Sequence, residues 1–310
     1  MNGAHKISDG SNSGSEAGTS GNGFKKINVL ISGLPGNMAT LDANKITKQE
    51  DMELAHIGLT GEGIVEKTPH IVCEDGSLVA LFAPQAHKQT LESYKEQVCE
   101  FIIVDFTAPP IKGLPSPAKG NAELYCSLKI PFIVGSTMPN EDSEMIKKMV
   151  ADSGNLAVIA PNMAAPIIIF QEMMEYIAKK YPGVLKDYMV SLSESHQAGK
   201  KDTSGTMRSV LKSIQKLGVP VEEKDIEMIR DPAIQENEFG IPKEYLGGHG
   251  YHWYNFTSLD GTVFLDFSHK VNGRDVYATG TLAAIRFLNK RIQEGIKGKA
   301  YSMIDVLSGQ

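Results

Sequence analysis

The segment ESHQAGKKDTSGT, residues 194–206, gathers side chains that could bind and protonate an anionic ligand. His196 stands at the end of a strand-like run, YMVSLSES, and Lys200 follows four residues later in a loop. His196 could stand across a small ligand from Lys200. A lysine beside a second cation and a desolvated ligand has its pKa lowered to a range useful for proton donation. We therefore take His196 and Lys200 as candidate catalytic residues, and we interpret Lys201 as a solvated charge. The alternative is a loop whose lysines are solvated and whose histidine packs.

The Ser-Gly-Thr sequence after these cations is typical of the start of a helix. Thr203 or Ser204 is the candidate N-cap of a helix expected at about residues 207–217, so Gly205 and Thr206 fall in the first turn. Backbone N–H groups in a first turn lack helical partners and can bind an anion. The segment thus predicts a carboxylate-binding site with a proton donor beside it.

A second candidate site is the glycine turn in ISGLPGNMA, which joins the first strand-like run to a helix. Gly33 and Gly36 would let the backbone approach a phosphate, and a helix beginning near Asn37 and Met38 would supply free N–H groups. The spacing is G-x-x-G, and Ala39 takes the third glycine position of a dinucleotide fingerprint. The alternative is a plain turn that needs a positive φ at Gly36.

Small and polar residues follow three more strand-like runs, in VDFTAP, VGSTMP and APNMA. Because open α/β sheets bind ligands at the carboxyl ends of their parallel strands, these residues could line one nicotinamide pocket. Glu62 lies just beyond the usual position of the acidic residue that holds the ribose hydroxyls, and no arginine replaces it, so NADH and NADPH are both candidates. The pocket residues suggested by position are Asp105, Thr107, Ser136, Thr137 and Asn162.

The order of the strand-like runs predicts an α/β fold. INVLISG, ELAHIGL, FIIVDFT, PFIVGST and LAVIAPN alternate with helix-like segments, as in a doubly wound, Rossmann-like parallel sheet. We expect a dinucleotide-binding domain at residues 25–165 and a substrate-binding and oligomerisation domain at 166–280. Residues 281–310 would pack back on the first domain. The Gly- and Ser-rich residues 1–24 are expected to form a disordered tail.

The second domain is expected to be of the α+β class, built on an open mixed sheet. Its strand-like runs are GYHWYNFTS, TVFLDFSHKV and DVYATG. In the second of these, apolar residues alternate with mostly polar ones, which is the period of a half-buried strand. A final helix is expected at residues 281–295.

Composition excludes several classes of function. A net charge of −6 argues against a general nucleic-acid surface, and no apolar run reaches the roughly 20 residues that cross a membrane. Cys73, Cys99 and Cys126 lack disulfide or metal spacing, and no metal-ligand cluster is evident. The first residues resemble neither a secretory signal nor a transit peptide. A cytoplasmic enzyme is expected, and the alternative is the plastid stroma with the transit peptide removed.

ESHQAGKKDTSGT closely resembles the active-site segment of dihydrodipicolinate reductase, also called 4-hydroxy-tetrahydrodipicolinate reductase. IRDP, GGHGYHWYNFTS, FSHKVNGRDVYATGT and YSMIDVL resemble the plant-type form of that family. The glycine turn, VDFT, VGST and APNM are similar to the family's cofactor segments in the same order. The resemblance covers about residues 26–307.

The resemblance implies reduction of 4-hydroxy-tetrahydrodipicolinate to tetrahydrodipicolinate, with loss of water, by NADH or NADPH, in lysine and diaminopimelate biosynthesis. It implies catalytic roles for His196 and Lys200, and it places Gln197, Gly205 and Thr206 against a dicarboxylate substrate. Relatives form homotetramers through the open sheet of the second domain. The cofactor-binding residues that the resemblance implies are Gly33, Gly36, Asn37, Met38, Phe106, Thr107, Gly135, Ser136, Thr137, Pro161, Asn162, Met163 and Arg274.

Some positions depart from the family pattern. Gln197 stands where many bacterial members have a second histidine, and the proline that they have before Ser204 is missing. Ala39 and Met138 replace glycines. The alternatives are therefore a nicotinamide oxidoreductase for another cyclic imine or keto acid, and a catalytically silent relative that serves as a binding or assembly protein. The intact set of His196, Lys200 and Ser-Gly-Thr argues against the silent relative.

Overall fold

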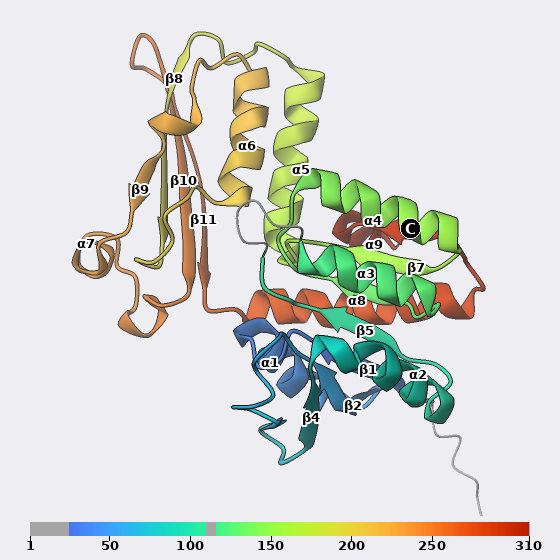
Figure 1. Cartoon of the computed structure of the whole chain (residues 1–310). Helices are drawn as coiled ribbons and strands as arrows, with labels where there is room; N and C mark the ends of the chain where they lie inside the picture. The colour runs from blue at the N-terminus through green and yellow to red at the C-terminus, as the bar shows by residue number, and fades with distance from the viewer. Residues whose placement is uncertain (1–24, 110–115, 310) are drawn as a thin grey trace, which may run out of the picture.

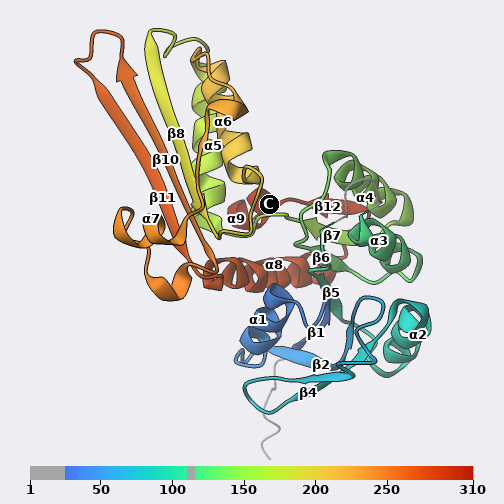
Figure 2. The ribbon, with the colours of Figure 1, turned by 60° about the vertical axis from the view of Figure 1, so that its left-hand side comes forward.

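The structure is a computed structural model, and it describes residues 25–109 and 116–309. The expected tail at residues 1–24 lies outside the described residues. Two sheets organise the described chain, and the second stands to one side of the first (Figure 1; Figure 2). No helix in the described parts is long and apolar enough to cross a membrane.

The first sheet has eight strands, all of which pair in parallel except β3, which is antiparallel to β4. Its central strands are buried along their whole length, as parallel strands covered on both faces must be. In spatial order the strands are β12 (Lys299–Tyr301), β7 (Leu156–Ile159), β6 (Phe132–Val134), β5 (Ile102–Asp105), β1 (Ile27–Ser32), β2 (Met52–Leu59), β4 (Leu78–Phe82) and β3 (His70–Val72).

Helices cover both faces of this sheet, which confirms the doubly wound architecture. On one face α1 (Asn37–Ile46) and α8 (Asp275–Gln293) share a core with the strands. On the other face α2 (His87–Gln97), α3 (Pro117–Ser127) and α4 (Asn140–Ser153) form a second core. β12 and α9 (Met303–Ser308) return the end of the chain to the first face, where Tyr301 and Met303 are buried.

The second sheet is a mixed four-stranded sheet, as expected. Its order is β11 (Phe264–Asn272), β10 (His249–Ser258), β8 (Tyr188–His196) and β9 (Glu227–Ile229); β8 pairs antiparallel with β10 and parallel with β9. α5 (Ala165–Lys180) and α6 (Gly205–Lys216) pack on one face through a separate apolar core. The short α7 (Pro232–Asn237) follows β9, and three-residue 3₁₀ turns lie at Pro84–Ala86, Glu223–Asp225 and Lys243–Tyr245.

One element was predicted wrongly. DVYATG was expected to be a strand, but these residues form the first turns of α8, which begins at Asp275. Val, Tyr and Thr favour strands by propensity, yet here tertiary packing decides the backbone. Gly280 lies so close to Met163 that an added Cβ would be 1.9 Å from its carbonyl oxygen, so only glycine fits this contact between α8 and the loop after β7. β11 therefore runs almost directly into α8 (Figure 2).

Candidate active site

The end of β8 carries the centre of the candidate site. Strand pairing places Glu194 opposite His252 of β10 and His196 opposite Gly250. Side chains two apart on a strand share a face, so Glu194 and His196 both point to the side covered by α6. The same face of β11 contributes His269, which lies opposite His252. Sheet register thus brings polar groups from three strands beside the start of α6.

Glu194 is fully buried, and its charge is matched by two kinds of donor. Nη2 of Arg230 lies 2.6 Å from Oε1 of Glu194, and the backbone N–H of Ser204 donates to both carboxylate oxygens at 3.1 and 3.2 Å. A buried carboxylate is tolerated only when it is paired and hydrogen-bonded in this way. Glu194 therefore ties β8 to the N-cap of α6.

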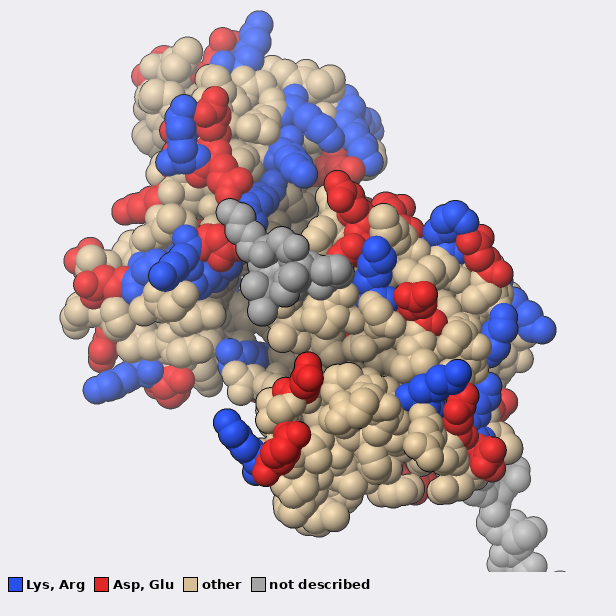
Figure 3. All heavy atoms as spheres, viewed as in Figure 1, with Lys and Arg blue, Asp and Glu red and all other residues tan. Residues whose placement is uncertain are grey.

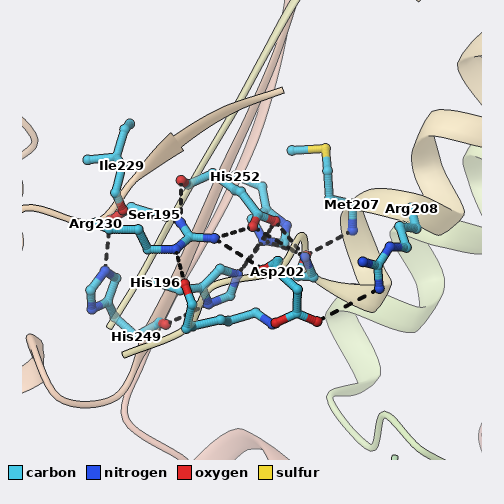
Figure 4. Close-up of polar contacts among 12 residues, drawn as sticks. Ser195, His196, Asp202, Met207, Arg208, Ile229, Arg230, His249 and His252 are labelled. Carbon is cyan, nitrogen blue, oxygen red and sulfur yellow. Dashed lines mark hydrogen bonds and ion pairs between the residues drawn. The ribbon is translucent and has the colours of Figure 1, made fainter. Parts of the chain in front are cut away.

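Arg230 holds the loop that carries Lys200. Nε of Arg230 donates to the carbonyl of Lys200 at 2.8 Å, and Nη1 donates to the carbonyl of Glu194 at 3.0 Å. The guanidinium group reaches from the residue after β9 across the end of β8 (Figure 4). Gln235 of α7 is also buried, and its amide donates to the carbonyl of His196 at 2.8 Å. Arg230 and Gln235 thus hold the end of β8 and the loop that follows it.

Lys200 lies in the loop that leads from β8 into α6. Nζ of Lys200 is 2.9 Å from Oδ1 of Asp202, and this contact lowers the pKa of the Asp202 carboxyl. Ser204 is the N-cap residue, and its Oγ accepts from the N–H of Met207 at 3.1 Å. Gly205 is exposed and Thr206 is half-buried, so backbone N–H groups of the first turn remain within reach of a ligand.

His196 lies in a hydrogen-bonded chain rather than at an open surface. Its Nδ1 is 3.0 Å from the carbonyl oxygen of His249, and its Nε2 is 3.0 Å from Nε2 of His252. His252 continues the chain through Nδ1, 3.0 Å from Nε2 of His269. Burial lowers the pKa of His196 to about 4, although the charge of Glu194 opposes this effect. Burial also lowers the pKa of His269 to about 4 and that of His252 well below its usual value.

Glu194, His196 and His252 could each offer one metal-ligating atom, and these atoms lie within 4.8 Å of one another. Sequence spacing did not reveal this cluster because its members come from two strands that are far apart in the chain. The carboxylate already neutralises Arg230, and a dication would compete with that pair. We assign the cluster to a hydrogen-bond network and not to a metal.

The candidate cofactor residues come together at one edge of the first sheet. Ser32, Asp105, Val134 and Ile159 are aligned across four neighbouring strands. The residues that follow them, among them Gly33, Phe106 and Gly135, therefore share the carboxyl edge where open α/β sheets bind ligands. The loops that follow β6 and β7, which were expected on the nicotinamide side, begin at this same edge.

The glycine turn has the close backbone approach that a dinucleotide turn needs. Gly33 has φ +100°, and an added Cβ would lie 2.5 Å from the carbonyl oxygen of Phe106. Gly36 has φ −58°, so the positive φ considered for Gly36 belongs to Gly33 instead. Gly36 is the N-cap of α1 and provides no side-chain cap, which leaves first-turn N–H groups for a pyrophosphate. These residues fit a nicotinamide dinucleotide.

Several other candidate cofactor residues brace the loops. The Thr107 hydroxyl donates to Oδ1 of Asp105 at 2.8 Å, and the Ser136 hydroxyl donates to the carbonyl of Thr107 at 2.7 Å. Asp105 itself is buried and accepts from Asn121 and Tyr125, so it supports the loop instead of lining a pocket.

The remaining candidates differ in exposure. Met163 is buried against Thr281 of α8, with its carbonyl oxygen packed on Gly280, and Asn162 Oδ1 accepts from the N–H of Ala164. Thr137, Pro161 and Asn37 are exposed at the sheet edge. Arg274 lies where β11 meets α8, and its guanidinium group lies beside Gly248.

Five residues around His196 were not predicted as site residues from the sequence: Glu194, Arg230, Gln235, His252 and His269. Glu194 shares a face of β8 with His196, whereas the other four reach the site through strand pairing and through the residues after β9. IRDP and the histidines of GGHGYHWYNFTS were noticed only as parts of a family resemblance. Figure 3 shows acidic and basic side chains mixed over the face it presents, so the site depends on local groups and not on a broad charged surface.

The fold and the two sites define a nicotinamide-dependent oxidoreductase. A family described as dihydrodipicolinate reductase, C-terminus, matches residues 166–307. The 4-hydroxy-tetrahydrodipicolinate reductase 2, chloroplastic, of Arabidopsis thaliana is 37% identical over 295 residues, with 94% of this chain and 80% of the relative covered. The probable reductase 2, chloroplastic, of Oryza sativa is 35% identical, with 90% and 82% covered.

A dipicolinate-bound dihydrodipicolinate reductase from Paenisporosarcina sp. TG-14 shares the fold, with a TM-score of 0.59 at 17% identity, covering 89% of this chain and 97% of that one. The identity to the plant reductases, over more than two thirds of each chain, shows that the chain belongs to the 4-hydroxy-tetrahydrodipicolinate reductase family. Membership favours that activity over a reductase for another cyclic imine and over a silent relative. It also supports the use of NAD(P)H.

Proposed function

We propose that this chain reduces 4-hydroxy-tetrahydrodipicolinate to tetrahydrodipicolinate with NADH or NADPH, as a step of lysine and diaminopimelate biosynthesis. The observation that supports this most is the loop of Lys200, which Arg230 fixes beside the uncapped N–H groups of Gly205 and Thr206. A dicarboxylate can be gripped there by a helix start and by an ammonium group.

The substrate roles follow from these contacts. The N–H groups of Gly205 and Thr206 would hold one carboxylate, and Gln197 would offer an uncharged hydrogen bond beside it. Lys200 would leave Asp202 and donate a proton to the carbon next to the one that receives hydride. Both ring nitrogens of His196 are bonded within the protein, so His196 would stabilise developing negative charge on the substrate without a direct hydrogen bond to it.

Bound NAD(P)H supplies the hydride. The turn from Gly33 to Met38 would hold the pyrophosphate, and the residues after β5, β6 and β7 would orient the nicotinamide ring. Arg274 would lie at the hinge between the two sheets. We take residues 25–165 and 166–280 as the cofactor and substrate domains, because their cores are separate. Closure of the two domains would exclude water from the reaction.

A homotetramer is proposed to form through the face of the second sheet opposite α5 and α6. That face carries Ser191, Ser193, Trp253 and Asn255, which alternate with the residues of the helix-covered core. Sedimentation equilibrium would test it. The relatives named chloroplastic support the plastid over the cytoplasm, and a fluorescent fusion to the full chain would decide between the two.

A coupled assay tests the proposed activity. The synthase that makes 4-hydroxy-tetrahydrodipicolinate would supply the substrate, and loss of absorbance would be followed separately with NADH and NADPH. We expect turnover that depends on both synthase and reductase. Oxidation of either cofactor without the synthase product, or none with it, would contradict the proposal.

A further inference from the structure

Three histidines form one hydrogen-bonded chain, and two of them, His252 and His269, have no role in the proposed reaction. The ring nitrogens are 3.0 Å apart at both links, His196 to His252 and His252 to His269. The chain runs from the loop of Lys200 to the edge strand β11. A neutral imidazole has one donor and one acceptor nitrogen, so each link fixes the tautomer of the next ring.

The tautomers follow from the carbonyl at one end. The carbonyl oxygen of His249 can only accept, so Nδ1 of His196 carries the proton and Nε2 of neutral His196 is an acceptor. Nε2 of His252 must then donate, which leaves Nδ1 of His252 as the acceptor for an N–H at Nε2 of His269. The last nitrogen, Nδ1 of His269, is a buried acceptor without a partner among the described residues.

The surroundings of the chain can respond to an added charge. Oε2 of Glu194 lies 3.7 Å from Nε2 of His196 and 3.6 Å from Nε2 of His252. Arg230 and Lys200 oppose a further positive charge, and burial opposes it as well. Tyr254 of β10 touches the second link at 3.3 Å, α6 contributes the hydroxyl of its N-cap, and α5 contributes the ring of Phe170.

We propose that the three histidines form a proton relay that charges His196 when a dicarboxylate binds beside Lys200. One proton is taken up from solvent and ends on Nδ1 of His269, the buried nitrogen that has no partner at rest among the described residues. His269 passes its Nε2 proton to Nδ1 of His252, and His252 passes its own Nε2 proton to Nε2 of His196. One proton is gained, every hydrogen bond of the chain is kept with reversed direction, and the positive charge lies on His196 beside Glu194.

Entry at His269 is favoured because the other ring nitrogens of the chain already use a proton or a lone pair in a hydrogen bond. Two ligand carboxylates would offset the positive field of Lys200 and Arg230, which opposes the charge in the resting protein. The inference rests on the proposed function, since it assumes a dicarboxylate at this site. His252 and His269 are positioning residues here, because they act on the ligand through His196.

Calorimetry with dipicolinate as the probe tests the relay. The protein would be saturated with NADPH, and binding enthalpies would be measured at mildly acidic pH in buffers of different ionisation enthalpy. We expect the wild type to take up a substantial fraction of one proton. Binding without proton uptake would overturn the relay while leaving the substrate class intact, whereas no binding of dipicolinate would count against the proposed function.

Two matched variants locate the entry point. His269→Gln keeps an N–H that can bond Nδ1 of His252 but offers no second site for a proton, so uptake should fall several-fold. His249→Gln makes the same change at a buried histidine whose side chain bonds Ser195 and Tyr245 on the other face of the sheet, so uptake should match the wild type. Equal uptake by His269→Gln and wild type would refute entry at His269.

The resting tautomers can be measured without any ligand. Nitrogen NMR of histidine-labelled protein should show the proton of His196 on Nδ1 and those of His252 and His269 on Nε2. The His252→Gln and His269→Gln spectra would assign the signals. A proton on Nδ1 of His252 would overturn the relay whatever the catalytic activity of the protein.

Discussion

Arg230 and Glu194 form an ion pair beneath the candidate active site, with Nη2 of Arg230 2.6 Å from Oε1 of Glu194. Glu194 is fully buried, and Arg230 also donates to the carbonyls of Lys200 and Glu194. The pair thus joins β8, the residue after β9 and the Lys200 loop. Its main effect is to fix the position of Lys200, because buried ion pairs by themselves add little net stability.

Breaking this pair should lower the free energy of unfolding strongly. Arg230→Ala leaves the Glu194 carboxylate buried without its cation, and we expect a loss of about 3–5 kcal/mol in the free energy of unfolding. Arg208→Ala is the control, because Arg208 is exposed and pairs with Glu223 at the surface, where about 1 kcal/mol or less is expected. Urea unfolding measures both variants. Equal losses of unfolding free energy in the two variants would show that the buried ion pair contributes no more than the exposed one.

Lys200→Ala should lower kcat by a factor of about 10² to 10⁴, the usual effect of removing a general acid. NAD(P)H affinity should be unchanged, because Lys200 lies in the loop after β8 of the second sheet and the glycine turn follows β1 of the first. Lys201→Ala is the matched control, since its neighbouring side chain is exposed. Steady-state kinetics and cofactor fluorescence titration give the two quantities. Loss of cofactor binding in Lys200→Ala would contradict the proton-donor role.

These two predictions differ in how far the sequence could lead to them. Lys200 could be assigned from a local pattern, because a histidine, a lysine and a helix start lie within one short segment. Arg230 could not, because it reaches Glu194 through the pairing of β8 with β9, and strand register depends on tertiary packing. The first-sheet strands were predictable from continuous apolar runs, whereas DVYATG was misassigned because β-branched residues there pack as a helix.

Substitution of Gly205 tests ligand binding without a loss of folding stability. An added Cβ there meets nothing within 4 Å, so Gly205→Ala should leave the free energy of unfolding unchanged or slightly raised. A methyl group at the first turn would crowd a bound carboxylate, and we expect KM for the substrate to rise about tenfold or more, equivalent to about 1.4 kcal/mol. Unchanged KM would place the carboxylate elsewhere.

Gly33→Ala is the contrasting change. Its φ of +100° and the 2.5 Å approach to Phe106 mean that alanine must strain the backbone. We expect a loss of about 1–3 kcal/mol in the free energy of unfolding together with weaker NAD(P)H binding. Thermal unfolding with and without cofactor measures both effects. A Gly33→Ala protein as stable as the wild type would contradict the strained turn.

Acidification should destabilise the protein through the histidine chain. His196 and His269 have folded-state pKa values lowered to about 4 by burial, whereas in the unfolded chain they protonate near 6.5. The unfolded state therefore binds more protons between these values, and the free energy of unfolding falls as the pH falls from 6.5 towards 4. His269→Gln should reduce this slope in urea unfolding. His70→Gln, at an exposed position on β3, should leave it unchanged.

Asp42 should make the free energy of unfolding fall as the pH rises, which is opposite to the effect of the histidines. It lies buried on α1, and burial raises the pKa of its carboxyl to about 7, with the Thr281 side chain on α8 offsetting the effect in part. The folded state then holds a proton that the unfolded state releases near 3.8, so this contribution to stability is lost as the pH rises from 3.8 through 7. Asp42→Asn mimics the protonated carboxyl and removes the titration.

We therefore expect Asp42→Asn to be more stable than the wild type above pH 7, by at most about 4 kcal/mol, which is the free energy of that pKa shift. The two proteins should converge as the pH falls towards 3.8. Chemical unfolding of both proteins across this range gives the difference directly. A constant difference at every pH would mean that Asp42 does not titrate on folding, and that the buried carboxyl finds a partner that holds its charge.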